Sequence, residues 1–264
     1  MSRGYIVIAQ NTATTDYIRC ADILCRSIKS VMPSAHVTLL TDQLVPGRKF
    51  DKTIIFPYGD QCASSDWKLA NDWQVYSASP YEYTIKLEAD LYLPRSIDWW
   101  WSVLEQRDLV VSSTIRDWRG DISNNRFYRK IFDDNSLPDV YNAITYFKKS
   151  DTAKKFFEIV RDIFENWPEY KKIIRCYDTE IATTDVVYAI AAHILGPENC
   201  MLPWFKDMSM VHMKKHIAGT VMSDWSREML WEVDQDVFRI GTVPQLWPVH
   251  YHVKTFADKL DAEL

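Results

Sequence analysis

The stretch from Tyr83 to Pro94 constrains the fold most, because it alternates apolar and polar residues without interruption. As a β-strand it would have an apolar face and a polar face, the polar one holding Thr84, Lys86, Glu88, Asp90 and Tyr92. Glu88 and Asp90 would point the same way, and carboxylates that close raise each other's pKa unless a cation lies between them. The stretch therefore predicts either a divalent-metal site that holds a phosphorylated substrate or a half-solvated strand with an acidic outer face.

The composition indicates a soluble globular protein. The chain has 264 residues, of which 47% are hydrophobic and 25% charged, enough for one large domain or two small ones. A net charge of −5 gives no global basic field for nucleic acid, although a local basic surface stays open. Five cysteines without a C-x-x-C motif argue against a disulfide framework and a zinc knuckle. With no run suited to a signal peptide or a membrane span, we expect a cytoplasmic protein.

The first 60 residues follow the order strand, helix, strand, strand. Residues 5–9 form an apolar run typical of a strand buried on both faces, and a helix follows from about Thr15 or Asp16 to Pro33. Strands over 37–40 and 53–56 complete the opening of an α/β nucleotide-binding fold. The loop 10–15 lies where such sheets bind ligands, but it matches neither G-x-G-x-x-G nor a Walker sequence.

The middle of the chain continues the α/β pattern without a repeat or a linker, so we expect a single domain. The expected helices and strands cover 66–79, 96–106, 109–111, 141–147, 151–166 and 178–195. From Ile181 to Pro197 the only carboxylate is Asp185, on an otherwise apolar helix. A bare buried carboxylate is costly, so Asp185 is paired or functional, or else the helix begins near Thr184 and Asp185 lies in its first turn.

Two further segments carry candidate binding residues. Segment 116–130 holds five basic and two acidic residues among aromatic ones, which indicates either a contact with a polyanionic or sugar-bearing partner or a solvated, mobile loop. Four of the six histidines fall in the runs 211–216 and 248–254. A histidine beside a lysine pair, such as His212, is a candidate metal ligand in a chain already suspected of binding metal and phosphate.

From residue 4 to 216, the order of these features resembles that of the GT-A nucleotide-sugar glycosyltransferases. The carriers of the resemblance are the opening β-α-β, the acid-x-acid triplet Glu88-Ala89-Asp90, a strand with Asn142, Asp185 at a helix start and the His212 run. The chain is most similar in this order to the retaining group with glycogenin and bacterial lipopolysaccharide galactosyltransferases, and to small bacteriophage glycosyltransferases. The resemblance implies one α/β domain with a mostly parallel central sheet flanked by helices. Residues 1–95 would bind the nucleotide sugar, and 96–264 would hold the acceptor half and a C-terminal metal and phosphate segment.

The resemblance also implies site residues. Metal ligands for Mn²⁺ or Mg²⁺ would be Glu88, Asp90 and His212, with His250 and His252 left open as alternatives for the late histidine. Contacts to the nucleotide sugar would come from Ala9, Asn11, Thr12, Tyr17, Lys68, Lys86, Lys214 and Lys215. Catalytic residues near the sugar would be Asn142 and Asp185. Acceptor contacts would come from Arg116, Trp118, Arg119, Arg126 and Arg129.

The expected function is metal-dependent transfer of a hexose or pentose from a UDP-sugar to a hydroxyl group, with retention of configuration. Two carboxylates and an imidazole can hold a hard cation that neutralises the departing diphosphate. The acceptor options are a hydroxylated pyrimidine in phage DNA, which would place the protein in the host cytoplasm, a glycan or a protein. The alternatives are a nucleotidyltransferase, disfavoured by the lack of a glycine-rich phosphate loop, and a non-catalytic module that binds carbohydrate or nucleic acid.

Overall fold

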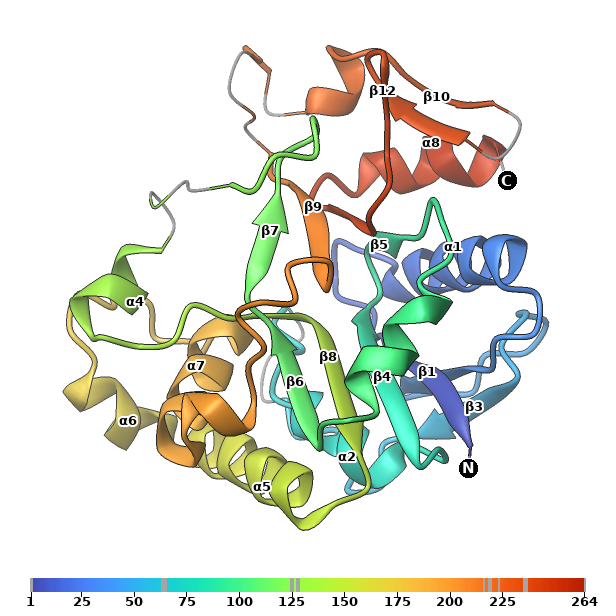
Figure 1. Cartoon of the computed structure of the whole chain (residues 1–264). Helices are drawn as coiled ribbons and strands as arrows, with labels where there is room; N and C mark the ends of the chain where they lie inside the picture. Colours follow the sequence, from blue (N-terminus) through green and yellow to red (C-terminus); the bar gives the residue numbers. More distant parts are fainter. Residues whose placement is uncertain are drawn as a thin grey trace.

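A six-stranded sheet forms the centre of the computed structural model, which describes residues 2–62, 66–123, 126, 129–215, 217, 220–222, 224–234 and 237–263 (Figure 1). Its strands run in the order β3-β2-β1-β4-β8-β6. Their bounds are β1 Arg3–Ile8, β2 Val37–Thr41, β3 Lys52–Ile55, β4 Tyr83–Glu88, β6 Leu109–Ser112 and β8 Tyr141–Lys148. Strands β1 to β4 are mutually parallel, and only β8 runs against its neighbours. The expected α/β class with a mostly parallel sheet is confirmed.

Helices cover both faces of this sheet. The α-helices are α1 Tyr17–Val31, α2 Val75–Ala78, α3 Trp101–Leu104, α4 Lys130–Asp134, α5 Asp151–Glu165, α6 Trp167–Ile173, α7 Thr184–Leu195 and α8 Thr255–Glu263. Short 3-10 helices are η1 Asp72–Gln74, η2 Asp98–Trp100, η3 Pro197–Asn199 and η4 Trp225–Arg227. On β1, Val7 packs in one apolar cluster with α1, whereas Ile6 packs in the other with α5 and α7. None of the described helices is long and apolar enough to cross a membrane.

A second sheet joins the C-terminal third of the chain to the end of β4. It has the order β5-β13-β9-β7, with β5 Leu91–Tyr92, β13 Val249–Tyr251, β9 Ser209–Met213 and β7 Thr114–Arg116. In its register His250 lies opposite Leu91 on one side and His212 on the other. A third, three-stranded sheet is formed by β10 Trp231–Asp234, β11 Val237–Ile240 and β12 Val243–Pro244.

The single strand expected over residues 83–94 is two strands. β4 ends at Glu88, a turn follows at Ala89 and Asp90, and β5 belongs to the second sheet. The polar face of β4 is not solvated, since the side chains of Thr84 and Lys86 are fully buried. The interpretation as a half-solvated strand is wrong, because helices cover β4 on both faces.

Three expected helices are shorter than predicted. The segment 66–79 is helical only from Asp72 to Ala78, the segment 96–106 from Asp98 to Leu104, and the segment 178–195 from Thr184 onward. Polar side chains hold the residues before the first two helices in other conformations. The Asn71 amide oxygen accepts from the Gln61 amide at 2.8 Å, and the Ser96 hydroxyl accepts from the Asp98 amide at 3.2 Å.

The expected N-cap of α1 is confirmed, and α5 covers all but the last residue of its expected range. The Asp16 carboxylate accepts from the Arg19 amide at 3.0 Å, so Asp16 rather than Thr15 caps the helix. Helix α5 ends at Glu165, one residue before the expected end. The division of the chain at residue 95 stays a prediction, and the central sheet takes strands from both sides of it.

Candidate active site

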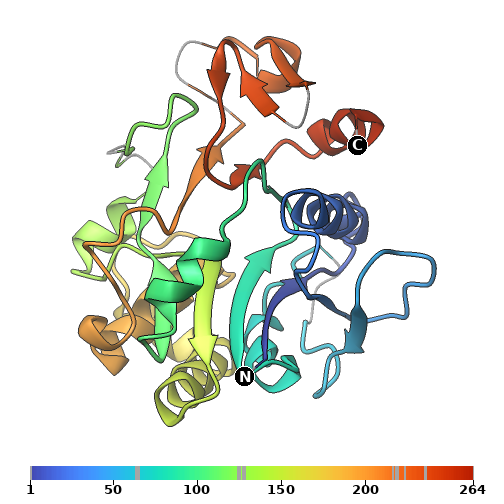
Figure 2. The same cartoon turned by 45° about the vertical axis from the view of Figure 1, so that its right-hand side comes forward.

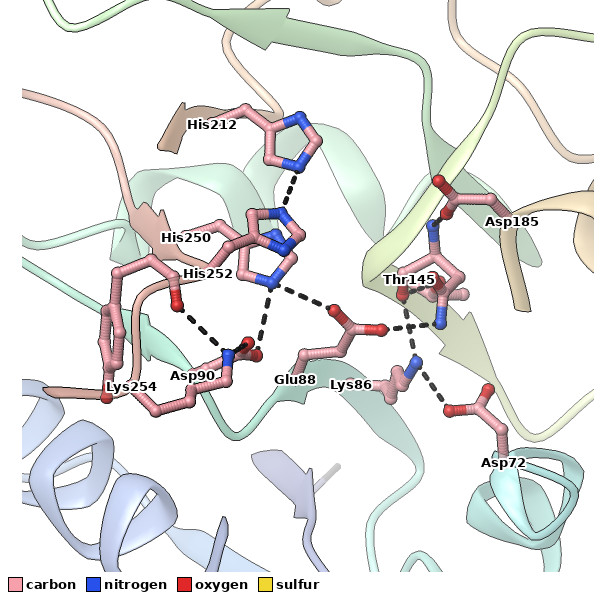
Figure 3. A network of polar contacts seen from close by, with 12 residues as sticks. Asp72, Lys86, Glu88, Asp90, Thr145, Asp185, His212, His250, His252 and Lys254 are labelled. Carbon is pink, nitrogen blue, oxygen red and sulfur yellow. Dashed lines mark hydrogen bonds and ion pairs between the residues drawn. The ribbon is translucent and has the colours of Figure 1, made fainter. Parts of the chain in front are cut away.

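The ends of β4 and β13 bring two carboxylates and an imidazole together. Glu88 is the last residue of β4, Asp90 lies in the turn that follows, and His250 is the middle residue of β13. The Nε2 atom of His250 lies 3.3 Å from Glu88 Oε2 and 3.2 Å from Asp90 Oδ1 (Figure 3). One ligand atom from each residue lies within 4.8 Å of the others, so the three form a group that could hold a metal ion.

Opposite effects set the charges of the two acids. Burial raises the pKa of Glu88, although His250 and Lys86 oppose the rise. Burial also acts against the charge of Asp90, but Lys254 and His250 outweigh it and hold the pKa of Asp90 well below its usual range. The ammonium of Lys254 contacts Asp90 directly and donates to the Tyr251 carbonyl oxygen at 3.1 Å. The site therefore already draws a cation to Asp90.

The late histidine beside both acids is His250, one of the alternatives left open, rather than His212. His212 lies on β9, next in line across the sheet, and its Nε2 lies 2.7 Å from Nε2 of His252. Burial lowers the pKa of His212 well below its usual range and that of His252 to about 2, with His250 and Lys214 acting in the same direction. The order of strands decides the placement, because β13 lies between β5 and β9 and so faces the end of β4.

Asn142 and Asp185 hold Glu88 in place. The Asn142 side-chain amide donates to Glu88 Oε1 at 2.9 Å, and the Asn142 backbone amide donates to Asp185 Oδ1 at 2.9 Å. The second oxygen, Asp185 Oδ2, accepts from Arg129 Nη1 at 2.9 Å. Asp185 thus lies in the first turn of α7 and is also paired, so the two explanations for an acid at this position hold together.

Lys86 was expected to contact the nucleotide sugar, but its side chain is fully buried. Its ammonium lies 2.7 Å from Asp72 Oδ1 and donates to the Asn142 carbonyl oxygen at 3.0 Å. Tyr188 on α7 donates its hydroxyl to the same Asp72 carboxylate. Because β4 is covered on both faces, Lys86 lies beneath Glu88 and is not open to a ligand.

In the loop after β1, the side chains that were expected to bind the nucleotide accept hydrogen bonds from backbone amides of the chain itself. The Asn11 side-chain oxygen accepts from the Ile18 amide at 3.0 Å, and the Thr12 hydroxyl accepts from the Thr15 amide at 3.1 Å. Ala9 is buried at the end of β1. The loop lies at the carboxyl end of β1, beside the carboxyl end of β4 where Glu88 lies.

Four further candidates for contacts to the nucleotide sugar are Tyr17, Lys68, Lys214 and Lys215. The ring of Tyr17 lies 5.3 Å from the Lys254 ammonium, which contacts Asp90. Burial lowers the pKa of Lys214, although Asp185 opposes the change, and Lys215 is exposed. Lys68 precedes the helical segment instead of lying on it, and its ammonium pairs with Asp60 at 2.7 Å.

The arginines of the segment 116–130 are bound within the chain to different degrees. The guanidinium of Arg116 donates to the Ser209 hydroxyl at 2.9 Å and lies 3.9 Å from the ring of Trp247. Arg129 is buried and donates to Asp139 at 2.6 Å besides Asp185.

The other two arginines are more exposed. Arg126 forms ion pairs with Asp133 and Asp139. Arg119 has a side chain that is 59% exposed, and its guanidinium lies 4.2 Å from the ring of Trp118. Of the acceptor-binding residues expected here, Arg119 and Trp118 keep the surface best suited to a partner. Residues 124, 125, 127 and 128 lie outside the described residues.

Lys254 was missed as a site residue, and His250 was left open only as an alternative metal ligand, although both belong to the histidine-rich run 248–254. The signal was the dense spacing of that run, with two histidines and a lysine at alternate positions. In β13 this spacing places His250 on the face that meets Glu88.

Comparison with solved structures assigns the fold. A galactosyltransferase, LgtC, in complex with donor and acceptor sugar analogues matches with a TM-score of 0.57 at 12% identity, over 99% of this chain and 96% of that chain. An active-site mutant of LgtC matches with a TM-score of 0.56 at 10% identity, over 98% of this chain and 95% of that chain. The glycosyltransferase GlyE of Streptococcus pneumoniae TIGR4 matches less well, with a TM-score of 0.45 at 10% identity over 77% of this chain and 46% of that chain. No family model matches the chain, and no curated protein matches its sequence significantly. The expected GT-A fold is confirmed.

Proposed function

We propose that the chain is a metal-dependent glycosyltransferase that moves a sugar from a UDP-sugar to a hydroxyl group. The observation that carries the proposal is the group formed by Glu88, Asp90 and His250 at the carboxyl end of the sheet. Open α/β sheets bind ligands at this end. The fold shared with LgtC supports the activity, since that enzyme is named as a galactosyltransferase.

The donor set fits a divalent cation of the Mn²⁺ or Mg²⁺ type. Carboxylate oxygens suit both ions, and a single imidazole adds a nitrogen ligand that is more typical of transition ions than of Mg²⁺. Asp90 pairs with the Lys254 ammonium, and this preference for a positive charge supports a cation at the same carboxylate. Glu88, Asp90 and His250 would hold the ion, which when bound supplies Lewis-acid neutralisation of the departing diphosphate.

The remaining residues position this group. Asn142 orients Glu88 by its side chain, while Asp185 fixes Asn142 and is neutralised by Arg129. Lys254 stays protonated, since Asp90 outweighs the effect of burial and raises the pKa of Lys254, so its ammonium can move from Asp90 to a phosphate. Both Asp185 oxygens accept hydrogen bonds, which suits a positioning residue better than a base. A retaining transfer needs no strong base, because the departing phosphate can take the acceptor proton.

The acceptor that we propose is a sugar hydroxyl, as in the acceptor analogue named for LgtC. The phage-DNA alternative rests on the basic segment, where Arg116 and Arg129 are engaged within the chain. Transfer to DNA should weaken by orders of magnitude between low and moderate salt. Transfer that is insensitive to salt would favour the glycan.

A thermal-unfolding panel of nucleotide sugars tests the donor. In the presence of Mn²⁺, UDP or a UDP-hexose at 100 times its Kd should stabilise the fold by about 2.7 kcal/mol. GDP-mannose in its place should give no shift, and EDTA should abolish the shift given by the UDP-sugar. Equal shifts in EDTA would contradict metal-dependent binding. Release of UDP from the stabilising sugar then separates an enzyme from a non-catalytic module, and a preference for nucleoside triphosphates would favour a nucleotidyltransferase.

A further inference from the structure

Three histidines gather beside the acids and form a second group that could hold a metal ion. His212 on β9, His250 on β13 and His252 just after it each place one ring nitrogen within 4.8 Å of the others (Figure 3). The ring centroids of His250 and His252 lie 4.5 Å apart, and those of His212 and His252 lie 4.8 Å apart. The parallel pairing of β9 with β13 sets His212 directly opposite His250.

The hydrogen bonding of His250 leaves one ring nitrogen free for a ligand. Its side chain is 7% exposed, and Nε2 faces oxygens of Glu88 and Asp90 at 3.3 and 3.2 Å. A nitrogen that faces carboxylates carries the proton, so in the neutral ring Nδ1 is a bare acceptor. This Nδ1 atom is buried and has no hydrogen-bond partner among the described residues. A carboxylate behind one nitrogen and an open lone pair on the other is the arrangement of a metal-binding histidine.

The other two histidines present nitrogens at a spacing close to that of a metal site. Nε2 of His212 and Nε2 of His252 lie 2.7 Å apart, so in the neutral pair one donates to the other. Two nitrogens on a tetrahedral zinc ion lie about 3.3 Å apart, for Zn–N bonds of about 2.0–2.1 Å. Small rotations of the two rings would therefore open the pair enough to admit an ion.

We propose that His212, His250 and His252 form a second metal site, the histidine site, for a borderline transition ion such as Zn²⁺. It adjoins the acid site, which is formed by Glu88, Asp90 and His250. Three imidazoles suit Zn²⁺ far better than Mg²⁺ or Mn²⁺, which prefer oxygen ligands. In this proposal the two sites share His250 and use opposite nitrogens, Nε2 beside the acids and Nδ1 beside the other two histidines. An ion on Nε2 leaves the proton on Nδ1, and an ion on Nδ1 leaves it on Nε2. Zn²⁺ in the histidine site therefore antagonises the ion held by Glu88 and Asp90.

Binding measurements on single variants test this proposal without any turnover assay. In His212→Ala, the Zn²⁺ Kd should rise roughly 100-fold or more. Even the loss of a residue that only hydrogen-bonds to a metal ligand lowers metal affinity about 10- to 100-fold. The Mn²⁺ Kd should change little. In Glu88→Gln the pattern should reverse, with Mn²⁺ binding lost and Zn²⁺ binding weakened by less than about 10-fold. His193→Ala, at an exposed histidine on α7, is the matched control.

Two further readouts make the outcome decisive. Co²⁺ in the histidine site should give the intense visible absorption of a low-coordinate ion, and the spectrum should persist in Glu88→Gln and vanish in His212→Ala and His252→Ala. Added Zn²⁺ should raise the Mn²⁺ Kd of the wild type but not that of His212→Ala. The proposal is overturned if His212→Ala and His252→Ala, folded by circular dichroism, bind Zn²⁺ as the wild type does. It is also overturned if Glu88→Gln loses Zn²⁺ as fully as His212→Ala does. Loss of UDP-sugar turnover alone would bear on the proposed function and not on this site.

Discussion

At the scale of single residues, the support of Glu88 depends on buried charge. Lys86 lies directly beneath the site, with Asp72 as its counter-ion and the Asn142 carbonyl oxygen as a further acceptor. Asn142 in turn donates to Glu88. Replacing a buried ion pair with apolar residues is often neutral for stability. The role that we assign to the Lys86–Asp72 pair is therefore to hold Asn142 in position rather than to stabilise the fold. Sequence alternation placed Lys86 on the correct face of the strand but could not show that helices cover that face.

Lys86→Met should destabilise the fold by about 3–5 kcal/mol, because it leaves the Asp72 carboxylate buried without a cation. Denaturant unfolding at pH 7.5 measures the change. The double variant Lys86→Met with Asp72→Asn, which removes the orphaned charge, should recover most of the loss. A single variant as stable as the wild type would show that the pair carries no such energy.

At the scale of elements, the site depends on short strands that pair over long distances in the sequence. The alternation of residues 83–93 predicted β4 and its two acids, but it continues through the turn at Ala89 and Asp90 and so concealed the break. β13 has three residues, and its partners are β5 and β9. No local pattern encodes such a register, which explains why sequence reasoning chose His212, beside two lysines, over His250.

The pairing of β9 with β13 also predicts a pH dependence of stability. The pKa values of His212 and His252 are lower in the folded chain than the unfolded value of about 6.5, so below that pH the unfolded chain binds more protons. Stability should therefore fall as pH falls below 6.5, by roughly 1 kcal/mol for each histidine at pH 5.5.

Denaturant unfolding in metal-free buffer at pH 7.5 and 5.5 checks this dependence. The double variant His212→Gln with His252→Gln should lose most of the slope, whereas His193→Gln, at an exposed position, should keep it. A double variant with the full wild-type slope would assign the dependence to other groups.

At the scale of the whole molecule, the candidate site combines acids from the N-terminal half of the chain with His250 and Lys254 from the C-terminal segment. Figure 2 shows α8 beside α1, where Arg19 pairs with Asp258 and Asp261. This docking holds the preceding residues, His250 to Lys254, against the end of β4. The opening β-α-β and the acids could be predicted from local patterns. The C-terminal contribution could not, because its contacts join residues about 160 positions apart, as in the Lys254–Asp90 pair.

The most direct test of the proposed function is Mn²⁺-dependent release of UDP from the preferred UDP-sugar by Asp90→Asn. Loss of a Lewis acid worth several kcal/mol should lower kcat by about 100- to 1,000-fold. Asp98→Asn, at an exposed acid of η2, is the matched control and should keep the wild-type rate. Thermal unfolding confirms that both variants are folded. Wild-type turnover by folded Asp90→Asn would contradict the proposal that Glu88, Asp90 and His250 form the catalytic metal site.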